Sequence, residues 1–223
     1  MSRESPSFTP ALFAFLTELR ANNDREWFAA NKARYVDEVQ EPALAFVEDV
    51  GHRMPQVSPY FGGKIFRIHR DVRFAKDKSP YKTHTGIQFR HETGKNPHAP
   101  GFYLHLEPSN VFMGCGTWRP EGDTLRRIRE AIARRPEQWR AIVAAPQFAE
   151  RFHFGGESLK RPPAGFNADH PLIDDIKCKD FIAITNLDEP VVTAPDFLQT
   201  FDALCRDGGP LMRFLCEAAG VAY

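Results

Sequence analysis

The sequence predicts an α+β fold in which an antiparallel β-meander packs against N- and C-terminal helices. Near both ends of the chain, apolar residues recur at helical spacing, as at Leu12, Phe15 and Leu19. Between residues 64 and 116 the apolar positions alternate instead, which is typical of strands. Short strands that follow one another along the chain favour antiparallel pairing, with helices covering one face of the sheet.

Three helices are expected before the sheet. The first begins after Thr9 and Pro10, which are a typical N-cap and a typical first helical residue. Asp24 caps the second helix, and Pro42 either ends that helix or opens a third. Residues 54–63 contain several Pro and Gly residues, so we expect a turn-rich connector there.

Four strands are predicted in the middle of the chain. The first covers residues 66–74, where four apolar side chains would share one face: Phe66, Ile68, Val72 and Phe74. A helix also fits part of this spacing, but the preceding Gly62 and Gly63 and the β-favouring residues indicate a strand. The other three strands are predicted at residues 83–90, 102–107 and 111–115.

The last part of the chain returns to helices. A helix rich in arginine begins at Asp123, and a long structured loop is expected over residues 152–166. One more strand is predicted at residues 181–185, followed by two closing helices separated by Gly208 and Gly209. No internal repeat divides the sequence, so we expect residues 1–223 to form a single domain.

The composition excludes some classes of protein. The 29 Lys and Arg residues balance 29 Asp and Glu residues, which excludes binding of nucleic acid or membrane by overall charge but leaves room for a local basic patch. No apolar run approaches the roughly 18 to 20 residues that span a bilayer, so we expect no membrane association. The 4 cysteines show no Cys-x-x-Cys spacing and fit a reduced, cytoplasmic protein with buried thiols.

The densest charged segment is a basic block over residues 64–82. It carries seven basic side chains against two aspartates, a net charge of +5. Arginine side chains bind phosphate and carboxylate groups in a bidentate way, and an interleaved tyrosine suits a nucleotide base. The block therefore predicts a site for a phosphate-bearing ligand, a nucleotide or nucleic acid, held by Arg67, Arg70, Arg73, Lys78, Tyr81 and Lys82.

A structural role is the main alternative for this block. Residues 166–189 carry a net charge of −4 and could neutralise it within the protein, as exposed charges often do. Arg70 is informative, because on the predicted strand it shares the apolar face and needs a carboxylate or a bound anion as its partner. Asp71 would lie on the opposite face, so the sequence does not identify that partner.

A metal- or acid/base-assisted hydrolase or transferase acting on an anionic substrate is a further alternative. His69, Asp71 and His84 are its candidate catalytic residues, and His105 could join them if the strands are neighbours. No metal-binding motif supports a metal site, so none is assigned. The sequence identifies neither a cofactor nor an oligomeric state.

Several motifs carry a resemblance to a known family. They include Asn22-Asn23-Asp24 and the pair of segments Arg70-Asp71-Val72-Arg73-Phe74 and Lys78-Ser79-Pro80-Tyr81-Lys82. With these motifs the chain resembles a widespread family of uncharacterised bacterial and fungal proteins, labelled as a domain of unknown function. The resemblance implies that the whole chain forms one family domain with the basic block as its signature. It implies no reaction, substrate or cofactor.

Overall fold

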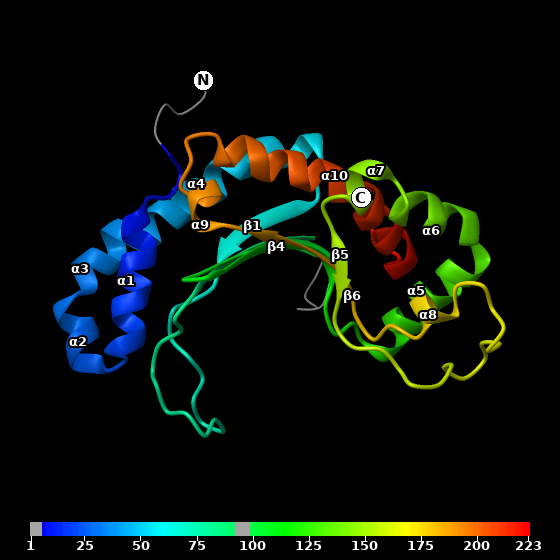
Figure 1. Ribbon diagram of the computed structural model, residues 1–223, viewed down its shortest axis with the longest axis horizontal. Helices are drawn as coiled ribbons and strands as arrows, with labels where there is room; N and C mark the ends of the chain where they lie inside the picture. Colours follow the sequence, from blue (N-terminus) through cyan, green and yellow to red (C-terminus); the bar gives the residue numbers. More distant parts are fainter. Residues whose placement is uncertain (1–5, 92–98) are drawn as a thin grey trace.

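The computed structural model describes residues 6–91 and 99–223 and confirms the α+β class. Six strands form one antiparallel sheet in the order β1-β2-β3-β4-β6-β5 (Figure 1). Strands β1 to β4 are consecutive neighbours and form the predicted meander, and β6 and β5 extend it. The strands are β1 (Phe61–Ile65), β2 (Thr85–His91), β3 (Gly101–Glu107), β4 (Asn110–Thr117), β5 (His153–Gly155) and β6 (Phe181–Leu187).

The N-terminal helices follow the predicted signals closely. Helix α1 (Pro10–Ala21) begins with Pro10, and α2 (Arg25–Ala30) is capped by Asp24, whose carboxylate accepts a hydrogen bond of 2.8 Å from the Trp27 amide. After α3 (Lys32–Tyr35), a π-helical turn at Val36–Gln40 leads into α4 (Glu41–Arg53). Pro42 lies in the first turn of α4 and therefore opens the helix.

The remaining helices follow the meander along the chain. They are α5 (Gly122–Arg134), α6 (Pro136–Val143), α7 (Pro146–Ala149), α8 (Ile173–Ile176), α9 (Glu189–Val192) and α10 (Phe197–Ala219). In the described part of the chain, none of the helices combines the length and apolar character that a membrane span needs.

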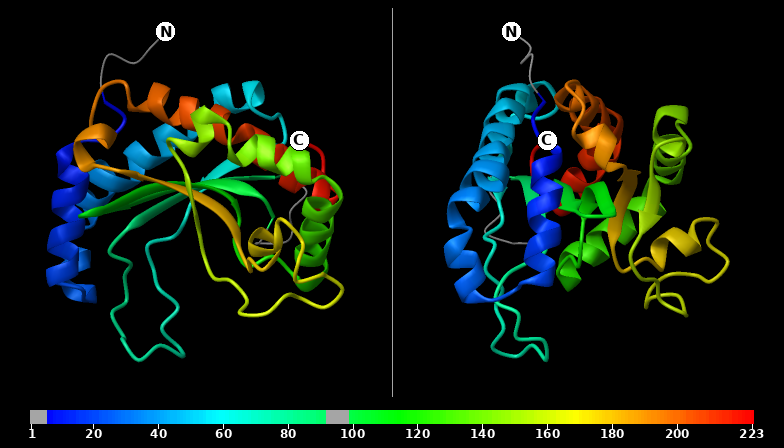
Figure 2. Two further views of the ribbon diagram at one scale, coloured as in Figure 1. Left: turned by 45° about the vertical axis from the view of Figure 1, so that its right-hand side comes forward. Right: turned by 60° about the vertical axis from the view of Figure 1, so that its left-hand side comes forward.

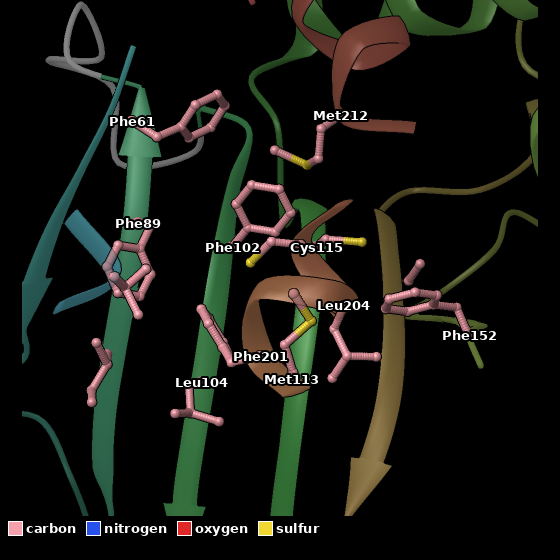
Figure 3. Close-up of a cluster of buried hydrophobic side chains, with 14 of the residues drawn as sticks. Phe61, Phe89, Phe102, Leu104, Met113, Cys115, Phe152, Phe201, Leu204 and Met212 are labelled. Atoms are coloured by element: carbon pink, nitrogen blue, oxygen red, sulfur yellow. The ribbon is translucent and has the colours of Figure 1, made fainter. Parts of the chain in front are cut away.

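The main core lies between the sheet and the helices α4 and α10. Figure 3 shows Phe102 and Leu104 of β3 beside Phe201 and Leu204 of α10, and all four side chains are buried. Burying a side chain of this size contributes about 1.5 to 3 kcal/mol. Alternate residues of β3 therefore face the core, and Tyr103, the residue between Phe102 and Leu104, points to the other face. We call this other face, which α4 and α10 do not cover, the open face.

The prediction of a strand at residues 66–74 is wrong. The first strand is instead β1, which lies directly before that segment and overlaps the expected connector. It pairs with β2, from Phe61 opposite His91 to Ile65 opposite Ile87. Residues 66–84 form a long loop that projects from the sheet on the side away from α4 and α10 (Figures 1 and 2). The alternation was misleading because Phe74, which would share a buried face, is 95% exposed.

The prediction of two closing helices is also wrong, because α10 continues through Gly208, Gly209 and Pro210. A Cβ atom at Gly208 would lie 2.8 Å from the Sγ atom of Cys115 in β4. The glycine therefore allows the helix to pack closely on the sheet, instead of ending the helix. Residues 152–166, where a loop was predicted, include β5, which forms a short strand at the edge of the sheet beside β6.

Candidate functional site

A pocket of about 450 Å³ opens between the end of α1 and the base of the long loop. Its size falls in the range of small-molecule sites. Three of its lining side chains are basic and one is acidic, which gives a net charge of +2. The lining residues are Arg20, Asn23, Arg70, Asp77, Ser79, Tyr81, Lys82, Thr83 and His84.

Asn23 fixes the base of the loop to the N-terminal helices. Its side-chain amide donates a hydrogen bond of 3.0 Å to the Tyr81 carbonyl, and its oxygen accepts one of 3.0 Å from the Tyr81 amide. The Tyr81 ring is buried and stacks on Phe28 at 4.1 Å between ring centroids. Tyr81 thus anchors the loop, and the pocket forms where the loop meets the corner between α1 and α2.

Three of the six predicted ligand residues have partners within the loop itself. Arg70 forms an ion pair with Asp77 and donates a hydrogen bond of 3.1 Å to the Ser79 carbonyl. Hydrogen bonds from Ser79 and Arg70 hold the pKa of Asp77 well below its ordinary value. Arg70 lines the pocket, and Asp77 is the partner that the sequence did not identify.

The other two, Arg73 and Lys78, are bound at the tip of the loop. Arg73 makes a bidentate contact with Asp71, at 3.0 Å from Nε and 2.7 Å from Nη2. Lys78 donates hydrogen bonds to the carbonyls of Val72 and Arg73. Neither residue lines the pocket. Among the ion pairs of the described residues, none joins the basic block to the acidic segment 166–189, in which Asp174 pairs with Lys177.

Lys82 differs from these side chains. It is half-buried, and its Nζ atom lies 5.3 Å from the centroid of the Phe66 ring, over the ring face. Burial lowers the pKa of Lys82, and repulsion from Arg67 lowers it further. Within residues 6–91 and 99–223, Lys82 has no carboxylate partner in an ion pair. Arg67 itself is exposed outside the pocket lining.

A polar cluster of Glu107, Thr83 and two histidines adjoins the floor of the pocket. Glu107 accepts hydrogen bonds from Arg20 at 3.1 Å and Thr83 at 3.0 Å. The His84 ring lines the pocket, with its centroid 4.5 Å from that of His105. Burial lowers the pKa of His84 to about 4, and repulsion from His105 contributes, so His84 is neutral near pH 7.

The structure separates the predicted catalytic residues. Only His84 lines the pocket; the exposed His69 contacts the Tyr81 ring at 5.2 Å between centroids, and Asp71 binds Arg73 at the loop tip. His105, the third histidine candidate, does lie beside His84. In the part of the chain that the structure describes, no three His, Cys, Asp or Glu side chains gather in a way that could hold a metal ion.

Sequence reasoning missed Arg20, Asn23 and Thr83 as pocket residues and Glu107 as their neighbour. Glu107 had a usable signal, because Tyr103, His105 and Glu107 alternate with buried residues along one strand and must share a face. Asn23 had only the family motif Asn22-Asn23-Asp24 as a signal, and Arg20 had none, since only the packing of the helices against the loop brings them to the pocket.

The chain was also compared with known proteins. Residues 11–214 match the family model DUF2461, described as a conserved hypothetical protein. A search of curated proteins gives no match. The matched segment includes the whole lining of the pocket.

Proposed function

The chain belongs to the DUF2461 family of conserved hypothetical proteins, and within this family we propose that the pocket binds a phosphate-bearing ligand. Its volume of about 450 Å³ suits a nucleotide better than a longer nucleic-acid strand. A strand of nucleic acid would need to follow the exposed loop as well, where Arg67 and Arg73 lie. The experiment below separates the two ligands.

The observation that carries this proposal is Lys82. The charge of a half-buried lysine without a carboxylate partner is unfavourable, because burial removes part of the water that solvates it. A bound phosphate would supply the missing negative charge. Hydroxyl groups of Ser79 and Thr83 and the guanidinium of Arg20 lie around the same pocket, where they could donate further hydrogen bonds.

Calorimetric titration of three probes tests the proposal: inorganic phosphate, adenosine monophosphate and a short single-stranded oligonucleotide. We expect Lys82→Gln to weaken binding by about 10- to 100-fold, because a hydrogen bond to a charged group is worth about 1.5 to 3 kcal/mol. Lys76→Gln is the matched control, since Lys76 lies exposed in the same loop outside the pocket. Equal affinity of the Lys82→Gln protein and the wild type would contradict the proposal, as would the absence of binding by all three probes.

The dependence on salt separates the two ligand types. An oligonucleotide that contacts several phosphate sites along the loop shows a steep decrease of affinity with salt, of about 0.7 log units per contact for each tenfold rise in salt. A mononucleotide in the pocket makes few such contacts and gives a shallow slope. Preferential binding of the oligonucleotide with a steep slope would move the proposed ligand to nucleic acid.

A structural role for the loop is the second candidate. The ion pair between Arg70 and Asp77, together with the Arg70 hydrogen bond to Ser79, ties the two arms of the loop together. If this is the purpose of the basic block, removal of Arg70 reduces stability and leaves ligand binding unchanged.

A further inference from the structure

Three side chains on the open face of β3 form a continuous hydrogen-bonded row. The Tyr103 hydroxyl lies 3.0 Å from Nδ1 of His105, and Nε2 of His105 lies 3.3 Å from a carboxylate oxygen of Glu107. The three residues are spaced by two along a strand, so their side chains point the same way. Glu107 borders the pocket through Thr83 and Arg20, and the row runs from there toward the middle of the sheet.

The direction of these hydrogen bonds follows from the charge of Glu107. Burial raises its pKa, but hydrogen bonds from Asn110, His105 and Thr83 outweigh burial and leave the pKa below its ordinary value. Glu107 is therefore ionised and can only accept, so Nε2 of His105 carries the proton. Nδ1 of the neutral imidazole must then accept the hydrogen bond, and the Tyr103 hydroxyl donates it. The same order of carboxylate, imidazole and hydroxyl activates the nucleophile in catalytic triads.

The surroundings keep this row in place. The His105 ring stacks on Phe112 at 4.7 Å and is buried. Gly86 lies opposite His105 in β2, and a Cβ atom there would come within 2.7 Å of the Tyr103 hydroxyl oxygen. The glycine thus provides the space that the hydroxyl occupies, which is a common use of glycine inside a strand. Tyr103 remains partly exposed on the open face.

Tyr103 lies outside the pocket lining, and Phe66 links it to the proposed phosphate site. Phe66 contacts Tyr103 edge-on at 6.1 Å between centroids, and Lys82 lies over the Phe66 ring at 5.3 Å. Burial, together with the charge of Glu107, raises the pKa of Tyr103 to about 12, so the hydroxyl stays neutral until its proton moves to His105. A neutral hydroxyl can approach an anionic group near Lys82 without the repulsion that a carboxylate nucleophile would meet. Phe66 thus connects a hydroxyl that has its own base to a cation that lacks a carboxylate partner among the described residues.

We propose that Tyr103 is a nucleophile for phosphoryl transfer, with His105 as its general base and Glu107 as the positioning residue. The inference rests on the proposed function for its substrate class, a phosphate ester. The Tyr103 oxygen attacks the phosphorus atom and forms a new O–P bond, while the hydroxyl proton moves to Nδ1 of His105. The ester P–O bond breaks on the side opposite Tyr103. The leaving oxygen departs with the electron pair and takes a proton from a water molecule, which becomes hydroxide, while His105 keeps the proton from Tyr103.

Water completes the cycle. The hydroxide oxygen attacks the phosphotyrosine from the side that the first leaving group occupied, and the bond between phosphorus and the Tyr103 oxygen breaks. The Tyr103 oxygen leaves with the electron pair and receives the proton from His105. The Glu107 carboxylate balances the positive charge of the imidazolium in both steps.

Labelling with diisopropyl phosphorofluoridate tests this assignment. The reagent forms an O–P bond with an activated hydroxyl and releases fluoride, and mass spectrometry identifies the labelled tyrosine. Tyr60 is an internal control, because it is 40% exposed and its ring stacks on that of His91. We expect Tyr103 to react about 100-fold faster than Tyr60, which is the contribution of a positioned general base.

Two variants distinguish activation from simple exposure. His105→Phe keeps an aromatic ring between His84 and Phe112 but removes the base, and Glu107→Gln keeps the shape but removes the charge. We expect both to lose the fast labelling of Tyr103, with labelling of Tyr60 unchanged. An unchanged circular dichroism spectrum shows that the variants are folded. Equal labelling of the two tyrosines in the wild type overturns the inference, as does wild-type labelling of Tyr103 in the folded His105→Phe protein.

The pH profile gives a readout that a structural role would not change. Burial lowers the pKa of His105, against the opposing effect of its hydrogen bond to Glu107, so the base is already neutral at pH 7. Labelling should reach a plateau near neutral pH and decrease in acid, whereas an ordinary phenol reacts faster up to its pKa of about 10. A rate that rises steadily to pH 10 overturns the inference. The reagent is uncharged, so its reaction does not depend on the phosphate site. Phosphate binding without fast labelling of Tyr103 would therefore exclude Tyr103 as the nucleophile but would still support the proposed phosphate pocket.

Discussion

The tip and the base of the long loop carry similar charges but hold them differently. At the tip, Arg73 and Lys78 are bound by Asp71 and by carbonyl groups of the loop itself. At the base, Lys82 is half-buried beside Phe66, and none of the described carboxylates pairs with it. The comparison teaches that a basic block in a sequence is not one site. The charged side chains of the block differ in how far the fold buries them away from water.

The largest expected effect on stability comes from aromatic residues at the base and the tip of the loop. Tyr81→Ala removes a buried ring that stacks on Phe28, and we expect it to lower the free energy of unfolding by about 3 kcal/mol. Phe74→Ala at the tip removes a ring that is 95% exposed, and should change stability by less than about 0.5 kcal/mol. Urea denaturation of both variants measures the difference. Equal losses would show that the base is no better anchored than the tip.

The second largest expected effect is a dependence of stability on pH, caused by His84 at the base of the loop. The pKa of His84 is about 4 in the folded protein, below its ordinary value near 6.5, so the folded state resists protonation. The stabilisation is complete above pH 6.5 and is lost as the pH falls toward 4. Because part of the ring is open to solvent, we expect the free energy of unfolding to decrease by only about 1 kcal/mol over this range. Denaturation of the wild type and of His84→Asn at several pH values measures it, and identical profiles would exclude His84 as the cause.

The smallest effect compares the two arginines of the loop. Arg70→Ala should lower the melting temperature slightly, because the Arg70 side chain is only 28% exposed and its guanidinium group ties the loop arms together. Arg73→Ala, with a side chain that is 77% exposed, should leave it unchanged. Thermal denaturation with and without phosphate separates the two candidate functions. Loss of phosphate binding with an unaltered melting temperature in Arg70→Ala would exclude the structural role.

Local signals in the sequence predicted most of the fold. Caps such as Asp24 and the alternation along Phe102, Leu104 and Leu106 depend on neighbouring residues, and the elements that they predicted are present. Two predictions failed where long-range contacts decide the outcome. The contact of Gly208 with Cys115 involves residues far apart in the chain, and β1 is set by its pairing with β2.

The pocket residues could be predicted only where they lie close together in the sequence. Arg70, Tyr81 and Lys82 lie in the basic block and were named from the sequence, and they line the pocket. Nothing in the block distinguishes Lys82 from Lys78, because burial beside Phe66 is a property of the folded chain. Arg20 and Asn23 are separated from the loop by some fifty residues, and only the packing of α1 and α2 against Tyr81 brings them there.

The paired hydrogen bonds between Asn23 and Tyr81 have a mechanical consequence. Because they fix the backbone at the base, the segment between Arg70 and Ser79 is closed off as a unit of its own. Lengthening such a closed segment adds little entropic cost, about 0.6 kcal/mol for each doubling of its length. A fluorescent or affinity tag inserted beside Phe74 would therefore leave the geometry around Lys82 intact. The tip is a natural attachment point for reporters of what the base binds.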